Sequence, residues 1–188
     1  MTEKRKDDNA LYFVALIPGT PVREEVWALK EEIAERYQSK GALRSPAHIT
    51  LHMPFKWREK KLETLTKTLG DVAGRTRNFS IQLTGFDFFE PRVIFVNVEK
   101  NEALNELQYD VAKAMRTNLN LLNADYKQRG FHPHMTIGFR DLKKAKFHEA
   151  KPAYQGREYE RVFEADKLCL LKHNGERWEE FAEFPFRK

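Results

Sequence analysis

The chain has 188 residues, of which 41% are hydrophobic and 12% aromatic, and this composition excludes an intrinsically disordered protein. It carries 33 basic and 28 acidic residues, and the net charge of +5 favours anionic partners without the dense basic surface of a dedicated duplex-binding protein. There is no stretch of 18 apolar residues, so no transmembrane helix is expected. The charged start MTEKRKDDNA lacks the apolar core of a secretory signal. We interpret residues 1–9 as a flexible tail and expect a cytoplasmic protein.

The order of the predicted elements is typical of an α+β protein, because alternating strand patterns are interspersed with amphipathic helix patterns. No Gly/Ser linker divides the chain, so residues 10–188 are expected to form a single domain. In chain order we expect a strand at 11–17, a helix at 21–39, a strand at 46–57, a helix at 59–74, strands at 79–88 and 92–99, a helix at 102–121, and strands at 134–139, 159–164, 167–172 and 177–184.

Two further features of the sequence complete this outline. The polar segment 141–157 shows no predicted element, and HNGE at 173–176 predicts an Asn-Gly hairpin turn between the last two strands. Cys169 is the single cysteine, so no internal disulfide can form, and its apolar context LCLL favours a buried, inert thiol.

The strand-like stretch PAHITLHMPFKW at 46–57 has an unusual polar face. Two histidines and a threonine share this face, whereas a solvated strand face usually carries Lys, Glu, Thr or Ser. The stretch HPHMTIGF at 132–139 repeats the pattern: His48 and Thr50 recur as His134 and Thr136, 86 residues later. In both copies a proline lies just upstream and an aliphatic residue follows the threonine.

The spacing of the motif has a direct chemical meaning. Residues i and i+2 of a strand lie on one face, about 7 Å apart, so an imidazole and a hydroxyl can contact one small anion together. Two such strands facing each other would surround a phosphate with two imidazoles and two hydroxyls. One histidine could accept a proton from water while the other donates one to the leaving oxygen, and the hydroxyls could bind the non-bridging oxygens. The pattern therefore predicts phosphoester cleavage.

The paired motif and the segment PRVIFVNVEKNEALNELQ resemble the 2H phosphoesterase superfamily, and most closely its group of 2′-5′ RNA ligase-like proteins, also described as RNA 2′,3′-cyclic phosphodiesterases. The resemblance covers about residues 10–185. It implies a bilobal α+β fold with pseudo-two-fold symmetry, in which two antiparallel sheets line a central cleft and helices lie outside. It also implies a 2′,3′-cyclic phosphodiesterase or reversible 2′-5′ ligase that needs no metal or other cofactor. His48 and His134 inherit the catalytic roles, and Thr50 and Thr136 inherit phosphate binding.

Other residues are candidates for substrate contact. Many bacterial members have an arginine five places after the second histidine, where this chain has Phe139. Arg140 follows and would share the face of His134 unless a bulge intervenes. His52 and His132 lie at positions of the same strand parity as the motif histidines. Arg92 is the second residue of the segment PRV, directly after its proline. Phe55 and Trp57 could stack on a base, and Lys56 could clamp it.

Two other functions compete with this interpretation. His132 and His134 could chelate a metal together with His48 and His52, although no carboxylate lies close to either motif. Alternatively, the same residues could form a non-catalytic module that binds RNA ends or nucleotides. The sequence leaves open which histidine is the acid, whether the reaction is hydrolysis or ligation, what the physiological substrate is, and the oligomeric state. No obligate protein partner is evident from it.

Overall fold

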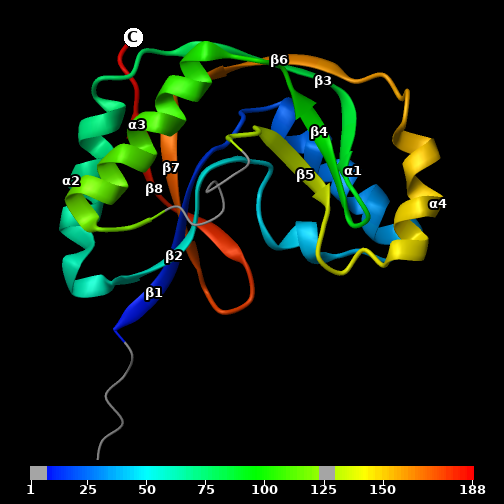
Figure 1. The fold of residues 1–188 in the computed structure, drawn as a ribbon, viewed down its shortest axis with the longest axis horizontal. Coiled ribbons are helices and arrows are strands. Elements are labelled where there is room, and N and C mark those ends of the chain that lie inside the picture. The colour runs from blue at the N-terminus through cyan, green and yellow to red at the C-terminus, as the bar shows by residue number, and fades with distance from the viewer. Residues whose placement is uncertain (1–7, 123–129) are drawn as a thin grey trace, which may run out of the picture.

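The computed structural model describes residues 8–122 and 130–188, so most of the tail expected at 1–9 lies outside the described residues. The elements, shown in Figure 1, are β1 (Asn9–Leu16), α1 (Val22–Tyr37), η1 (Gly41–Arg44), β2 (Ile49–Arg58), η2 (Glu59–Lys61), α2 (Leu62–Ala73), β3 (Phe79–Phe89), β4 (Val93–Val98), α3 (Glu102–Leu119), β5 (His134–Gly138), α4 (Lys144–Tyr154), β6 (Glu160–Ala165), β7 (Lys167–His173) and β8 (Trp178–Pro185).

The strands form two four-stranded antiparallel sheets, each with two helices on one face. The first sheet has the order β2-β1-β7-β8 and is covered by α2 and α3, whereas the second has the order β5-β4-β3-β6 and is covered by α1 and α4. Helix α1 follows a strand of the first sheet but packs on the second, so the chain crosses between the two halves at its start (Figure 1). This α+β architecture, with two sheets and outer helices, confirms the expected fold.

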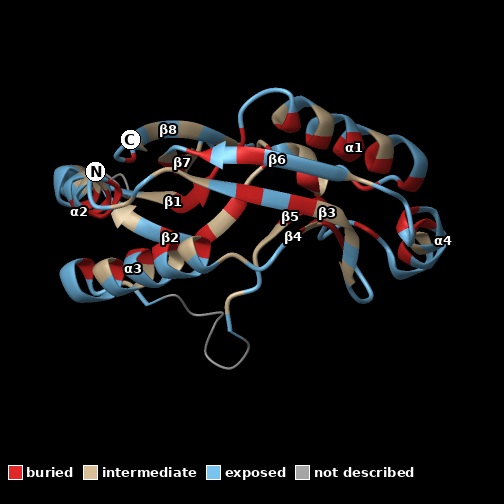
Figure 2. Ribbon diagram, turned by 90° about the horizontal axis from the view of Figure 1, so that it is seen from above, coloured by how far each residue is buried: buried red, intermediate tan, exposed pale blue. Residues whose placement is uncertain are grey.

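The hydrophobic core lies between the sheets and their helices, and the buried residues of the helices face the strands (Figure 2). The helix predicted at 21–39 is confirmed as α1, and its buried residues Val22, Val26, Ile33 and Tyr37 recur at helical spacing. A second, smaller cluster occupies the opposite face of the first sheet and comprises Phe13, Ala15, Ile17, Cys169 and Leu171, with Trp178 packed against it. Both faces of this sheet are therefore partly apolar.

The two motif strands lie at sheet edges, and each contains a bulge at the same point of its motif. In β2, Thr50 pairs with Ala15, and one extra residue follows before the next pair. In β5, Thr136 pairs with Phe95, and again one extra residue follows. The extra residues are Leu51 and Ile137, the aliphatic residues after each threonine, and both are fully buried. The repeated bulge is the local signature of the pseudo-two-fold relation between the halves.

One element escaped the sequence-based prediction. Helix α4 lies inside the polar segment 141–157, and its buried residues Phe147, Ala150 and Tyr154 are spaced at three and four positions. Only three residues of the helix are buried, lysines are among its other residues, and Pro152 lies inside the helix, so the periodicity is too weak to predict a helix. The Asn-Gly hairpin turn is confirmed: the backbone N–H of Asn174 donates to the carbonyl of Arg177, between β7 and β8. Among the described residues, no helix combines the length and apolar character needed to cross a bilayer.

Candidate active site

The two motif histidines lie at equivalent places, where each edge strand begins. His48 immediately precedes β2, and His134 is the first residue of β5. These two edge strands contact each other where the halves of the molecule meet. The charge of His134 is among the causes that lower the pKa of His48, which is consistent with two imidazoles within electrostatic range of each other.

The same backbone device orients both imidazoles. His48 Nδ1 lies 2.8 Å from the carbonyl oxygen of Pro46, and His134 Nδ1 lies 2.7 Å from the carbonyl oxygen of His132. A carbonyl oxygen can only accept a hydrogen bond, so Nδ1 carries the proton in both rings. In each neutral ring Nε2 is therefore the nitrogen with the free lone pair, available to exchange protons with a ligand.

A phenylalanine on the neighbouring strand supports each imidazole. The ring centroids of Phe13 and His48 are 4.9 Å apart, and those of Phe95 and His134 are 5.0 Å apart. Phe13 packs edge-on against Trp178 at 4.6 Å, whereas Phe95 packs against Phe89 at 4.5 Å. Sequence reasoning missed these aromatic residues, because apolar residues in strands carry no signal that separates a site from ordinary core.

Burial lowers the pKa of both motif histidines. For His48, desolvation is the largest cause, followed by the charge of Lys30 and, more weakly, that of His134, and its pKa falls to about 3. For His134, desolvation again lowers the pKa, and the charge of His132 adds to it. In both cases the hydrogen bond to the backbone carbonyl opposes the shift. Both imidazoles are thus neutral near pH 7 until a ligand changes their surroundings.

The two threonines share the half-buried character of the histidines. Thr50 and Thr136 lie two residues after His48 and His134, and their strand partners are Ala15 and Phe95. Neither threonine hydroxyl has a hydrogen-bond partner among the residues that the structure describes. The hydroxyls are therefore free to donate to a ligand beside the imidazoles.

A pocket of about 710 Å³ borders the segment that leads into β2. It lies between this segment, the first turns of α1 and the β7–β8 hairpin, and its lining includes Trp27, Arg44, Ser45, Pro46, Ala47 and Trp178. Aromatic and guanidinium groups beside a candidate phosphate site are the residue types that contact bases and backbone phosphates.

The bulges change the face on which the residues after each threonine lie. His52 pairs with Val14, is 1% exposed and packs edge-on against Phe55, so it lies in the core on the helix side of the first sheet. The parity expected for His52 is thus lost at Leu51. The ring centroid of His132 is 6.3 Å from that of His134, so His132 lies beside the site.

The candidate arginines are both exposed. A bulge does intervene between Thr136 and Arg140, and β5 ends before Arg140, whose φ is 62°. Its guanidinium lies 5.4 Å from the centroid of the Phe139 ring. Arg92 lies in the turn between β3 and β4, and Phe89 of β3 contacts the His134 ring at 5.0 Å. The backbone N–H of Arg92 donates to the carbonyl of Phe89 at 3.2 Å, across this turn.

The residues proposed to stack and clamp a base lie far along β2. A strand rises about 3.3 Å per residue, so Lys56 lies roughly 25 Å along the strand from His48. Phe55 is buried and packs against Tyr12, and the indole N–H of Trp57 donates to the carbonyl of Lys61 at 2.8 Å. Phe55 and Trp57 thus have structural contacts, and Lys56 is exposed away from the motif.

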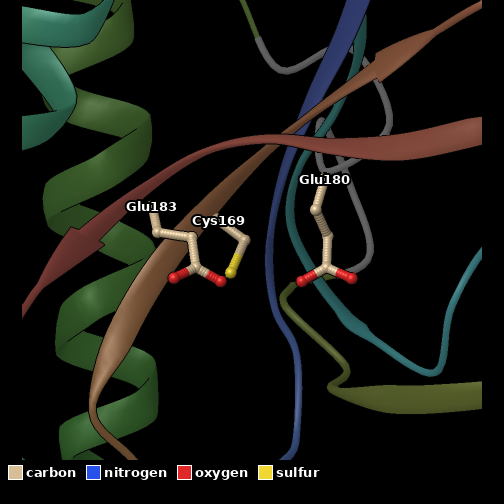
Figure 3. A group of neighbouring side chains, drawn as sticks. All are labelled: Cys169, Glu180 and Glu183. Atoms are coloured by element: carbon tan, nitrogen blue, oxygen red, sulfur yellow. The ribbon is translucent and has the colours of Figure 1, made fainter.

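A candidate metal-binding group elsewhere in the described structure consists of Cys169, Glu180 and Glu183 (Figure 3). Glu180 forms an ion pair with Arg23, and Glu183 forms one with Lys167 at 2.9 Å. Burial, followed by the two carboxylates, raises the pKa of the Cys169 thiol to about 12. A neutral thiol and two paired carboxylates are poor ligands, so these residues do not fit a metal ion. Among the described residues the motif histidines form no such group of three.

Comparison with known proteins identifies relatives along most of the chain. The family model described as the 2′-5′ RNA ligase superfamily matches residues 21–177. A protein of Geobacillus sp. strain WCH70, provisionally named a phosphoesterase, is 33% identical over 72% of each chain. A provisionally named phosphoesterase of Bacillus cytotoxicus is 30% identical over 66% of each chain.

Solved structures with low sequence identity share the fold. LigT of E. coli complexed with 3′-AMP aligns with a TM-score of 0.71 at 16% identity, over 96% of this chain and 99% of LigT. The protein TT0787 of Thermus thermophilus aligns with a TM-score of 0.66 at 17% identity, over 94% and 98% of the two chains. LigT has also been crystallised with NADP⁺, and that structure aligns with a TM-score of 0.65 at 16% identity over 95% and 98%.

Proposed function

This chain belongs to the 2′-5′ RNA ligase superfamily, and we propose that it is a phosphoesterase that opens 2′,3′-cyclic phosphates at RNA ends or on nucleotides. The observation that carries the proposal is the matched orientation of two imidazoles. His48 and His134 both hold the proton on Nδ1 and leave Nε2 for chemistry. Two such groups at one site are what an in-line displacement with one base and one acid requires.

The reaction uses the four motif residues in two roles. One histidine accepts a proton from water as the new P–O bond forms, and the other donates a proton to the ribose oxygen as the old bond breaks. Thr50 and Thr136 donate hydrogen bonds to the non-bridging oxygens, where negative charge accumulates. With a 5′-hydroxyl as the nucleophile in place of water, the same steps in the same direction form a 2′-5′ linkage: the 5′-oxygen bonds to phosphorus, and the ribose 3′-oxygen leaves and takes the proton of the acid.

The ligand class is supported by two features. The surplus of 33 basic over 28 acidic residues favours an anionic ligand. The pocket beside Pro46 has tryptophans and arginines in its lining, residue types that suit a nucleoside, although Glu24, Glu179 and Glu180 also line it and the four motif residues do not. The nucleotides in the LigT crystals belong to that protein, but they are consistent with a nucleotide ligand in this one.

No metal or other cofactor takes part in this proposal, because the two histidines and two hydroxyls already supply proton transfer and charge stabilisation. The Cys169 group is ion-paired, and His52 faces away from the motif. A metal site built from the four histidines is therefore the weaker alternative. An oxygen-rich cage of the kind that Mg²⁺ prefers is not part of the motif either.

The decisive experiment is turnover of a 2′,3′-cyclic mononucleotide and of an RNA oligonucleotide with a cyclic-phosphate end. Both are followed with and without EDTA, and the product is identified as the 2′- or 3′-phosphate. Turnover that resists EDTA supports the proposal. Loss of turnover that Zn²⁺ or Mn²⁺ restores would establish the metal alternative. Saturable binding of the cyclic nucleotide with no product would identify a non-catalytic binding module.

A further inference from the structure

Lys30 is a charged residue on an otherwise apolar face of α1. It follows Leu29 and lies three or four positions from Val26 and Ile33, which are all buried in the core. Lys30 itself is only 1% exposed. Lysine is almost never fully buried without a partner, because removing an ammonium group from water is costly. Among the described residues, no carboxylate forms a salt bridge with Lys30, so its burial calls for another explanation.

The ammonium group is bound by backbone carbonyls of the segment that leads into the first motif. Lys30 Nζ donates to the carbonyl of Ser45 at 2.9 Å and to that of Pro46 at 3.0 Å. The carbonyl of Pro46 is also the acceptor for His48 Nδ1, at 2.8 Å. One oxygen atom therefore joins the buried cation to the first motif imidazole.

The second motif has no such lysine among the described residues. The carbonyl of His132 orients His134, and the charge that acts on His134 is that of the His132 imidazole, on the same segment. The two motif histidines are thus equal in tautomer but unequal in electrostatic surroundings. Lys30 is the feature that breaks the symmetry of an otherwise paired site.

Resting on the proposed function, we propose that Lys30 is a positioning residue for His48, which fixes the Ser45–Pro46 backbone that orients the imidazole and holds a positive charge behind it. This charge keeps His48 neutral, so that His48 is the general base of hydrolysis and His134 is the general acid. His48 Nε2 takes the proton of the attacking water as its oxygen bonds to phosphorus. His134 Nε2 gives its proton to the ribose oxygen as that oxygen leaves.

The groups that face the pair support this division. His48 is faced by Lys30 from α1, by His134 from β5 and by the apolar ring of Phe13 from β1. Lys30 is faced by the Trp27 ring at 5.9 Å and by the two carbonyls. Burial lowers the pKa of Lys30 to about 7, so Lys30 is charged over the acidic range in which the histidines titrate.

The test is an NMR titration of the imidazole protons in the substrate-free protein, which does not depend on turnover. In the wild type, His48 should titrate at a lower pH than His134. Lys30→Met should raise the pKa of His48 by about one unit or more, because a neighbouring like charge is removed. The pKa of His134 should move much less. Lys67→Met, which removes an exposed lysine from α2, is the matched control and should move neither.

Turnover gives a second measurement. Lys30→Met should lower kcat/KM and move the acidic limb of its pH profile towards higher pH, whereas a merely structural loss would lower kcat/KM at every pH alike. Lys30→Gln retains a donor without the charge, and should keep more activity than Lys30→Met while its acidic limb shifts in the same way. If either variant fails to fold, the order of the two histidine pKa values in the wild type still tests the proposal.

Two results would overturn the role of Lys30: a His48 pKa in the wild type at or above that of His134, or an unchanged His48 pKa in a folded Lys30→Met protein. The proposed function fails differently. If the titrations behave as expected but no cyclic phosphate is turned over, Lys30 still sets the charge of His48 and the reaction is another one.

Discussion

His48 and His134 are held in the same tautomer by the same means, a hydrogen bond from Nδ1 to the carbonyl oxygen two residues earlier in the chain, at 2.8 Å and 2.7 Å. This bond uses no side chain other than the imidazole itself. It requires only that the backbone before each motif strand bends so that the carbonyl points at the ring. Each motif is therefore complete within a few consecutive residues, and the fold need only bring the two segments together.

The first prediction concerns the two histidines as a pair. Replacing His48 or His134 by Ala should lower kcat on a cyclic nucleotide by at least roughly 10²-fold, because each change removes one of the two proton-transfer groups. The double variant should be far less than multiplicatively worse, since neither histidine can complete the reaction without the other. Steady-state kinetics on the three variants checks this. His148→Ala, at an exposed position of α4, is the control, and near-normal turnover in either single variant would contradict the pairing.

The second prediction separates the threonines from the histidines. Thr50→Val and Thr136→Val keep the shape of the side chain but remove a hydrogen bond to the phosphate. A hydrogen bond to a charged group contributes about 1.5–3 kcal/mol, so kcat/KM should fall roughly 10- to 100-fold in each variant. Thr→Ser at either position should lower kcat/KM only slightly, because serine keeps the hydroxyl. Unchanged kcat/KM in a Thr→Val variant would show that the hydroxyl does not bind the substrate.

The third prediction is an acidic optimum for kcat/KM. This parameter reports the free protein, in which burial lowers the pKa of both histidines below the ordinary 6.5, with that of His48 at about 3. One histidine must be protonated, so activity should be lost as the pH rises through the lowered pKa of the acid. The optimum should therefore lie below pH 6.5. In kcat both limbs should lie at higher pH, because the bound phosphate favours the imidazolium forms. A kcat/KM plateau above pH 7 would contradict these pKa shifts.

Sequence reasoning predicted the paired motif, the succession of strands along the chain and most of the helices because these depend on local patterns. It could not predict the bulges at Leu51 and Ile137, since an extra residue in a strand leaves the alternation of apolar residues only slightly changed. Because the sequence does not predict the bulge at Leu51, it assigns His52 to the face of His48, whereas His52 lies on the opposite face of the sheet. Lys30 carried a visible signal, a cation within an apolar stripe, but the sequence does not show which carbonyls lie opposite it.

The fourth prediction concerns the contact between η1 and the end of β5. A Cβ at Gly41 would lie 2.7 Å from the carbonyl oxygen of Phe139 and 2.9 Å from a carboxylate oxygen of Asp141, which accepts hydrogen bonds from the backbone N–H of Gly41. Gly41→Ala should therefore lower the free energy of unfolding by about 1–3 kcal/mol, as overpacking does. The control is Gly19→Ala, where a Cβ would meet nothing within 4 Å. Urea denaturation measures the free energy of unfolding of both variants. An equal value for Gly41→Ala and Gly19→Ala would show that η1 shifts to make room for the added Cβ.

The last prediction uses Lys30 to test the structure through stability alone. Its pKa is about 7 in the folded protein and 10.5 as the ordinary value, so between these pH values the unfolded chain binds the extra proton. A group that holds more protons when unfolded makes stability rise with pH, and here the window runs from about pH 7 towards 10. The rise contributed by Lys30 can reach about 1.4 kcal/mol per pH unit, the value of one proton. Below pH 7 both states are protonated and this contribution is flat. Urea denaturation of the wild type, Lys30→Met and Lys67→Met at several pH values between about 6 and 9.5 isolates it, because each variant lacks one lysine of the wild type, buried in the first and exposed in the second. The wild type and Lys67→Met should rise together, and Lys30→Met should rise less. Parallel curves for all three would mean that the ammonium group of Lys30 is hydrated in solution, and the link from α1 through Pro46 to His48 would then have to be abandoned.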